Sequence, residues 1–107
     1  MRRAQKLLGS WTDPDTREVV QIKTSSRLKS YKVEVYSDGV IRSRGVINLD
    51  PFNPQESVAL FATGPGSRQL PTLTHILIPE MADDSSISLL KATDQEHVFD
   101  KVRYLHS

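Results

Sequence analysis

The chain has 107 residues and a formal net charge of +1; 37% of its residues are hydrophobic and 25% are charged. This length suits one domain, residues 1–107, with a modest core, and the composition excludes general disorder. The absence of cysteine excludes disulfides, thiol nucleophiles and thiolate metal sites. No apolar run could cross a bilayer as a helix, and residues 1–8 lack the hydrophobic stretch of a secretory signal. We therefore expect a cytoplasmic protein with no membrane partner.

Short β-branched runs, separated by Gly, Pro, Asp, Asn and Ser, predict an all-β chain. Residues 1–8 are expected to form a short helix or arm, and residues 9–12 and 18–24 a first hairpin. The clearest hairpin follows, with strands at 31–36 and 40–47. Its Asp38-Gly39 pair supplies the positive φ angles of a tight turn, and Gly45 predicts a bend or bulge.

The second half of the chain continues the pattern, with strands expected at 57–63, 72–78, 87–92 and 98–105. The connections are too short for crossover helices, so the strands should pair sequentially and antiparallel. Closure would remove both sheet edges. The sequence therefore predicts an eight-stranded antiparallel up-and-down barrel, closed or nearly closed. Two facings of the last strand stay open: Asp100 and Tyr104 inside, or Phe99 and Leu105 inside.

Gly9-Ser10-Trp11, at the entry to this strand meander, resembles the opening of the lipocalin and avidin-like (calycin) barrels. In that group the tryptophan plugs one end of the barrel, and a basic residue late in the chain packs across it. The resemblance implies that Gly9, Trp11 and Arg103 close the barrel, with the Arg103 guanidinium stacked on the Trp11 ring as a cation–π pair.

No catalytic motif stands out. The three histidines, His75, His97 and His106, lack metal-ligand spacing, and the chain has neither a Gly-x-Ser-x-Gly turn nor a phosphate-binding loop. We expect no metal and no cofactor, and an enzyme is the less favoured class. For a small calycin-like enzyme, the residues to test would be His75, Tyr31 and Asp100.

A barrel of eight strands can just hold one small apolar ligand. The leading expectation is therefore non-enzymatic binding of a small hydrophobic molecule, in the barrel or at its rim. The expected ligand contacts are Tyr31, Ser43, Phe61, His75 and Leu77. The His75 side chain could face the interior or the solvent, and both orientations stay open.

A packed interior would instead make the chain a protein-interaction or oligomeric module. Residues 1–54 contain 10 Lys and Arg against 6 Asp and Glu, whereas residues 55–107 contain 4 against 7. This polarity can favour head-to-tail pairing of protomers, although an unevenly charged solvated surface would give the same counts. Loop residues Phe52, Leu70 and Met81 could anchor a partner.

Nucleic acid is the less expected partner. The candidate surface is on the central hairpin, where Tyr36 could stack a base among basic residues: Arg27, Lys29, Lys32, Arg42 and Arg44. Glu34 and Asp38 interrupt this surface, and the chain is nearly neutral, whereas nucleic-acid binding usually requires a basic excess.

Overall fold

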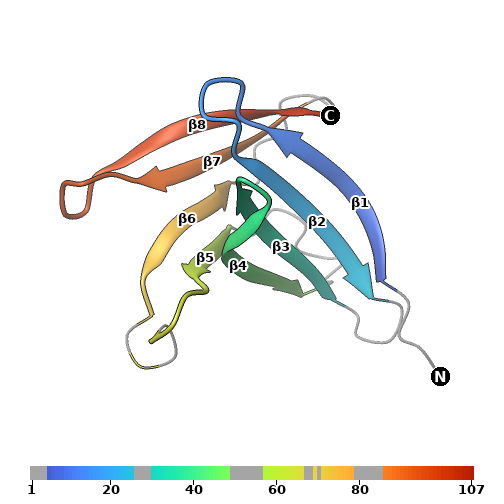
Figure 1. Cartoon of the computed structure of the whole chain (residues 1–107), viewed down its shortest axis with the longest axis horizontal. Helices are drawn as coiled ribbons and strands as arrows, with labels where there is room; N and C mark the ends of the chain where they lie inside the picture. The colour runs from blue at the N-terminus through green and yellow to red at the C-terminus, as the bar shows by residue number, and fades with distance from the viewer. Residues whose placement is uncertain (1–4, 26–29, 49–56, 67–68, 70, 79–85) are drawn as a thin grey trace.

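The computed structural model describes residues 5–25, 30–48, 57–66, 69, 71–78 and 86–107. Its eight strands are β1 (Gln5–Thr12), β2 (Val19–Ser25), β3 (Ser30–Ser37), β4 (Val40–Asn48), β5 (Val58–Ala62), β6 (Leu73–Ile78), β7 (Ser86–Ala92) and β8 (Phe99–His106). They form one closed antiparallel barrel in sequence order (Figure 1). The predicted all-β, eight-stranded closed barrel is therefore confirmed.

The first strand begins earlier than the sequence pattern indicates. Residues 5–8 belong to β1 rather than to a helix or arm, and residues 1–4 lie outside the described part of the chain. Each of the other seven predicted strands begins and ends within one residue of its observed bounds.

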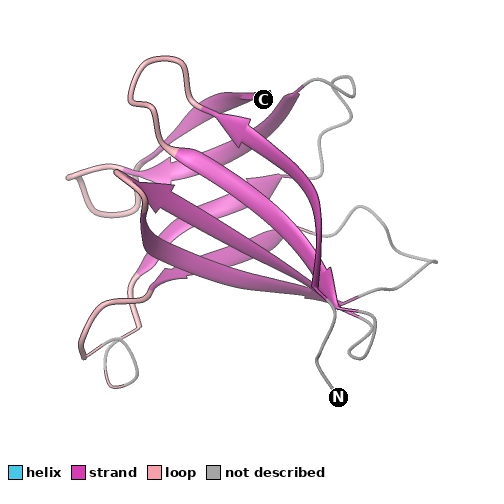
Figure 2. Ribbon diagram, turned by 45° about the vertical axis from the view of Figure 1, so that its right-hand side comes forward, coloured by secondary structure: helices cyan, strands magenta, loops and turns pink. Residues whose placement is uncertain are grey.

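In an up-and-down barrel, the connections that follow the odd-numbered strands share one end. The β1–β2, β3–β4, β5–β6 and β7–β8 connections lie there, and the N-terminal strand begins at the opposite end (Figure 2). The β3–β4 connection is the predicted tight turn, because Asp38 and Gly39 have φ values of 53° and 76°.

Gly45 serves a different purpose from the one predicted. The irregularity in the β3–β4 pairing lies between Val35 and Tyr36. At Gly45, an added Cβ would overlap with the Leu60 side chain and lie 2.6 Å from the Ala59 carbonyl oxygen. The glycine therefore allows β5 to approach β4 closely.

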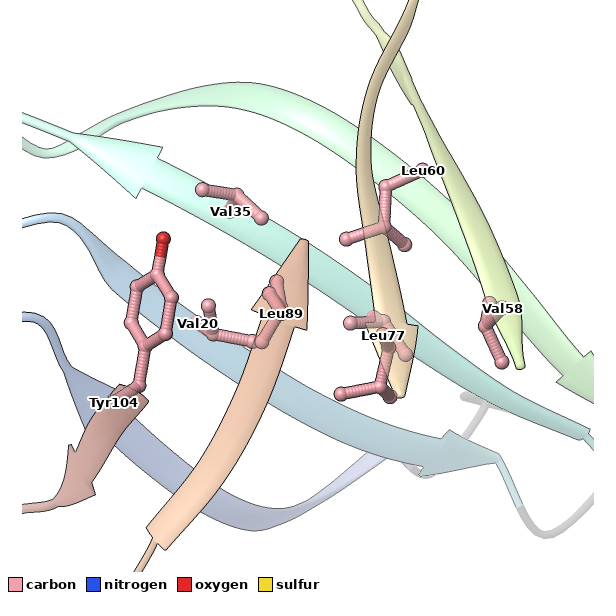
Figure 3. Packing of buried hydrophobic residues seen from close by; sticks show 8 residues of the cluster. Val20, Val35, Val58, Leu60, Leu77, Leu89 and Tyr104 are labelled. Atoms are coloured by element: carbon pink, nitrogen blue, oxygen red, sulfur yellow. The ribbon is translucent and has the colours of Figure 1, made fainter. Parts of the chain in front are cut away.

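Apolar side chains from β2, β3, β5, β6, β7 and β8 meet inside the barrel (Figure 3). The buried members of this core are Val20, Val33, Val35, Val58, Leu60, Leu77, Leu89 and Tyr104. Because Tyr104 is fully buried and Val102 packs against the same core, β8 has the facing that places Tyr104 inside.

Strands β1 and β8 close the barrel, as predicted. Trp11 pairs with His106 and Thr12 with Leu105. The Trp11 ring lies over Gly9, where an added Cβ would overlap with it. The Trp11 and His106 rings meet edge to face, with centroids 5.3 Å apart and an interplanar angle of 80°.

The hydrogen bond of Arg103 differs from the stack on Trp11 that the resemblance implies. Its side chain is exposed on β8, and its Nε donates a hydrogen bond to Ser86 Oγ at 3.0 Å. His106 is instead the ring partner of Trp11. Among the described residues, the buried Trp11 Nε1 has no hydrogen-bond acceptor.

Candidate functional site

The β1–β2 connection is folded around Asp13. Its carboxylate accepts hydrogen bonds from the Asp15 amide and the Thr16 hydroxyl, both at 2.9 Å. The backbone carbonyl of Asp13 accepts from the Arg17 amide, and the Asp13 amide donates to the Glu18 carbonyl. Arg17 has a left-handed backbone (φ 68°). The chain then enters β2 with Glu18 on the same side as the buried Val20.

Glu18 is the centre of a partly buried polar group that we term the Glu18 cluster: Glu18, His75, Lys91 and Tyr104. Glu18 Oε1 accepts a hydrogen bond from Tyr104 Oη at 2.5 Å and lies 3.0 Å from His75 Nε2. Glu18 Oε2 accepts from Lys91 Nζ at 3.4 Å. One carboxylate at the start of β2 therefore joins β6, β7 and β8.

The environment of the Glu18 cluster fixes its protonation. Burial opposes ionisation of Glu18, but hydrogen bonds from His75 and Tyr104, with the charges of His75 and Lys91, outweigh burial and lower its pKa to about 2. Burial and the Glu18 carboxylate raise the pKa of Tyr104. Such a carboxylate is a weak base and such a phenol a weak acid, so this pair is poorly matched to proton transfer.

His75 faces the interior, which resolves the orientation left open by the sequence; it is 5% exposed. Because the ionised Glu18 can only accept hydrogen bonds, His75 Nε2 is the donor. His75 Nδ1 lies 2.8 Å from Thr74 Oγ1, which lies 2.6 Å from Ser43 Oγ and 3.3 Å from the Leu60 carbonyl oxygen. Both nitrogens of His75 are therefore engaged within the protein.

The predicted ligand contacts do not form one site. Ser43, His75 and Leu77 are buried in the packed interior. Tyr31 is half-buried and pairs with Ile47, whereas Phe61 is 41% exposed, as expected for a side chain on the outer surface. The enzyme candidates also remain apart, because Asp100 is exposed.

A second site lies on the outer wall, beside the β1–β2 and β3–β4 connections. This rim pocket has a volume of about 350 Å³ and is lined by Arg17, Val19, Gln21, Tyr36, Asp38 and Gly39. Its strand residues alternate with buried ones: Val19 and Gln21 flank Val20, and Tyr36 follows Val35. They therefore face outward.

Tyr36, one wall of the rim pocket, is held by its neighbours. Tyr36 Oη donates to Glu34 Oε1 at 3.0 Å and accepts from Lys23 Nζ at 3.3 Å. Lys23 Nζ also lies 2.9 Å from Glu34 Oε1 and 5.6 Å from the centroid of the Tyr36 ring. These contacts fix the ring before any ligand arrives.

The pKa values around Tyr36 agree with this geometry. The hydrogen bond to Glu34 raises the pKa of Lys23. For Glu34, burial opposes ionisation, but Lys23, Tyr36 and Arg44 outweigh it and lower the pKa. Lys23 and Glu34 therefore stabilise each other's charged forms, as an ion pair beside the Tyr36 hydroxyl.

Two opposite charges at the rim pocket are left unmatched. Arg17 and Asp38 are exposed, and neither side chain forms a hydrogen bond or an ion pair with a described residue. Both have left-handed backbone conformations, with φ values of 68° and 53°.

The basic surface considered for nucleic acid is only partly available. Arg42 and Arg44 are exposed on β4, but Arg44 lies 3.5 Å from the Glu34 carboxylate. Arg27 and Lys29 lie outside the described residues. Nothing in this arrangement adds to the sequence argument.

Glu18 and the rim pocket were missed in the sequence, although one signal was present. Glu18 is in the same alternation phase as Val20 and Ile22, which predicts a carboxylate on the core side of β2. No comparable signal marks the rim pocket, because its lining combines outward strand positions with two connections.

The closed eight-stranded barrel is consistent with a calycin-like architecture in general. Within the described ranges, no set of three or more His, Asp or Glu residues could hold a metal ion. No helix among these residues is long and apolar enough to cross a membrane. Comparison with protein-family models, curated proteins and solved structures finds no match, so kinship with lipocalins or avidin stays a prediction.

Proposed function

We propose that this protein is a non-enzymatic binding protein that takes a small molecule in the rim pocket. The observation that carries the proposal is a preformed outer pocket of about 350 Å³, within the size range of small-molecule sites. The Tyr36 ring and Val19 supply apolar contact, and Gln21 supplies an amide that can orient a polar group.

The rim is favoured over the interior, the other place expected from the sequence. In the described part of the barrel, the apolar core and the Glu18 cluster already occupy the interior with side chains that contact one another. A ligand there would have to displace buried side chains that already contact one another, at a cost of several kcal/mol for large apolar groups.

A fragment screen by amide NMR tests the proposal. We expect shift changes at Val19, Gln21 and Gly39 for small aromatic molecules, because these residues line the rim pocket. Gln21→Trp should fill the pocket and abolish the changes. The matched control Val46→Trp, at an exposed strand position outside the pocket, should retain them. Shift changes confined to Val33 and Leu89 would place the ligand in the barrel and contradict the proposal.

A second candidate function, self-association or protein binding, is favoured by apolar side chains on the outer wall. Val46 on β4 is 57% exposed. Phe61 on β5 pairs with Arg44 on β4. Arg44 and Val46 are two residues apart and so share the outer face of β4, which places Phe61 and Val46 close together on the outer wall. If this surface forms a dimer, the mass measured by sedimentation equilibrium should rise with concentration, and Val46→Lys should reduce the rise. A monomeric mass at all concentrations would reject self-association.

A further inference from the structure

We infer that the rim pocket selects a zwitterion: a small aromatic molecule carrying a carboxylate and an ammonium group, as an aromatic amino acid does. This inference rests on the proposed binding function and adds the chemical class of the ligand.

Arg17 and Asp38 reach the pocket from different connections, Arg17 from β1–β2 and Asp38 from β3–β4. Neither charge is matched by a described residue. A ligand with one charge would gain from one of these side chains and be repelled by the other. A zwitterion gains from both, with its carboxylate toward Arg17 and its ammonium toward Asp38.

Three further charges close to the pocket in sequence or structure have partners of their own. Lys23 and Glu34, which both contact the Tyr36 hydroxyl, are paired at 2.9 Å. Glu18, which follows Arg17 in the chain, is turned toward His75 and Tyr104 inside the barrel. Among the residues that line the pocket, Arg17 and Asp38 are the charged ones.

The backbone positions of Arg17 and Asp38 are fixed by the folded connections. The Arg17 amide donates to the Asp13 carbonyl at 2.9 Å, and Asp38 stands in a two-residue turn. Between them, the held Tyr36 ring offers a flat surface on which an aromatic body can stack. A largely preformed frame lowers the ordering cost of binding.

NMR titration with three related probes separates the charges. The probes are L-phenylalanine, phenethylamine, which lacks the carboxylate, and 3-phenylpropionate, which lacks the ammonium group. We expect L-phenylalanine to bind about two- to fivefold more tightly than either, because each exposed ion pair contributes modestly. Shift changes at Val19, Gln21 and Gly39 report the binding.

Charge-removing variants then assign each group. Arg17→Gln should weaken L-phenylalanine and 3-phenylpropionate but not phenethylamine, and Asp38→Asn should weaken L-phenylalanine and phenethylamine but not 3-phenylpropionate. Asparagine tolerates the left-handed backbone of Asp38. The controls Arg42→Gln and Asp94→Asn change exposed charges outside the pocket lining, and they should leave all three affinities unchanged.

The failures of the two proposals are distinguishable. If the three probes bind at the pocket equally, or if neither variant changes their order, the charge assignment is overturned while the binding function stands. If no probe and no neutral aromatic fragment shifts the pocket amides, both proposals are overturned.

Discussion

The carboxylate of Glu18 links strand β2 to His75, Lys91 and Tyr104 on three other strands. Placing a carboxylate on the core side of a barrel is costly unless its charge is paired and its oxygens accept hydrogen bonds. Both oxygens of Glu18 have partners. The partners in the cluster therefore offset the cost of placing the Glu18 charge on the core side. An unpaired carboxylate at this position would destabilise the folded barrel.

Replacing Glu18 with glutamine should reveal this contribution. The amide loses the charge that Lys91 and His75 face, and its NH₂ group cannot accept a hydrogen bond. We expect Glu18→Gln to lower the free energy of unfolding by about 2–4 kcal/mol, measured by urea denaturation at pH 7. The control Glu96→Gln removes an exposed acid from the β7–β8 turn and should have no measurable effect. Equal results for the two variants would show that the cluster adds no stability.

Gly9 and Trp11 give a residue-scale test of the barrel closure. A Cβ at position 9 would overlap with the Trp11 ring, whereas a Cβ at Gly64 would meet nothing within 4 Å. We expect Gly9→Ala to destabilise by about 1–3 kcal/mol through overpacking. Gly64→Ala should leave the melting temperature unchanged or slightly higher. Thermal unfolding followed by Trp11 fluorescence measures both, and a neutral Gly9→Ala would contradict the packing of the ring over this glycine.

At the scale of elements, one carboxylate on each face of the barrel wall connects β2 or β3 to its neighbours by hydrogen bonds and ion pairs. Glu18 acts on the inside through the Glu18 cluster, and Glu34 on the outside through Lys23 and Tyr36. Both carboxyl groups have folded-state pKa values below the ordinary 4.5. Stability contributed by such groups is fully present above the unfolded pKa and is lost as pH falls through the folded pKa.

The folded protein should therefore lose stability as pH falls from about 4.5 toward 2, the pKa of Glu18. Urea midpoints measured across this window should decline steeply for the natural chain. They should decline less steeply for Glu18→Gln, which has no group to protonate at position 18. Parallel curves for the two proteins would mean that Glu18 titrates alike in the folded and unfolded chains.

Strand bounds could be predicted from the sequence where apolar and polar residues alternate or a turn motif is present, and not elsewhere. The strands with clear alternation or turn signals were predicted to within one residue, including the Asp38-Gly39 hairpin. The start of β1 was missed because the pairing with β2 shifts between Leu7 and Gly9, so no regular period marks it. Strand β5 reads Val-Ala-Leu-Phe-Ala, an apolar run without a period, which hid the outward facing of Phe61.

The candidate site was harder to predict than the fold. Glu18 could have been assigned to the core side from its phase with Val20, but its partners lie 57, 73 and 86 residues away in the chain. The rim pocket depends on two left-handed residues and on a tyrosine held by Lys23 and Glu34. Local sequence specifies the Asp38 turn, whereas the left-handed Arg17 follows from hydrogen bonds formed in the folded connection.

At the scale of the whole molecule, the pairing of β1 with β8 closes the sheet, and it is as short as the pairing of β4 with β5. It consists of two paired positions, a hydrogen bond from the Ser107 amide to the Ser10 carbonyl at 2.8 Å, and a hydroxyl contact between Thr12 and Ser107 at 2.9 Å. By contrast, β2 and β3 pair at seven positions and β3 and β4 at eight. Strand β5 is also held by its buried core residues Val58 and Leu60, whereas the paired end of β8 is exposed at Leu105 and His106. The barrel should therefore open first along β1 and β8.

Hydrogen exchange tests this order of opening. We expect the Ser107 amide to exchange through a local opening, with a smaller free energy than the amides of Val33 and Val35 in the core. His106→Ala removes the ring contact with Trp11 and should speed exchange at Ser107. The exchange free energies of the β3 amides should still equal the variant's global free energy of unfolding. The control His97→Asn alters an exposed histidine with φ 61° in the β7–β8 connection, where asparagine tolerates the backbone, and should not change Ser107. Equal exchange free energies at Ser107 and Val33 would instead mean that β1 and β8 separate only when the whole barrel unfolds.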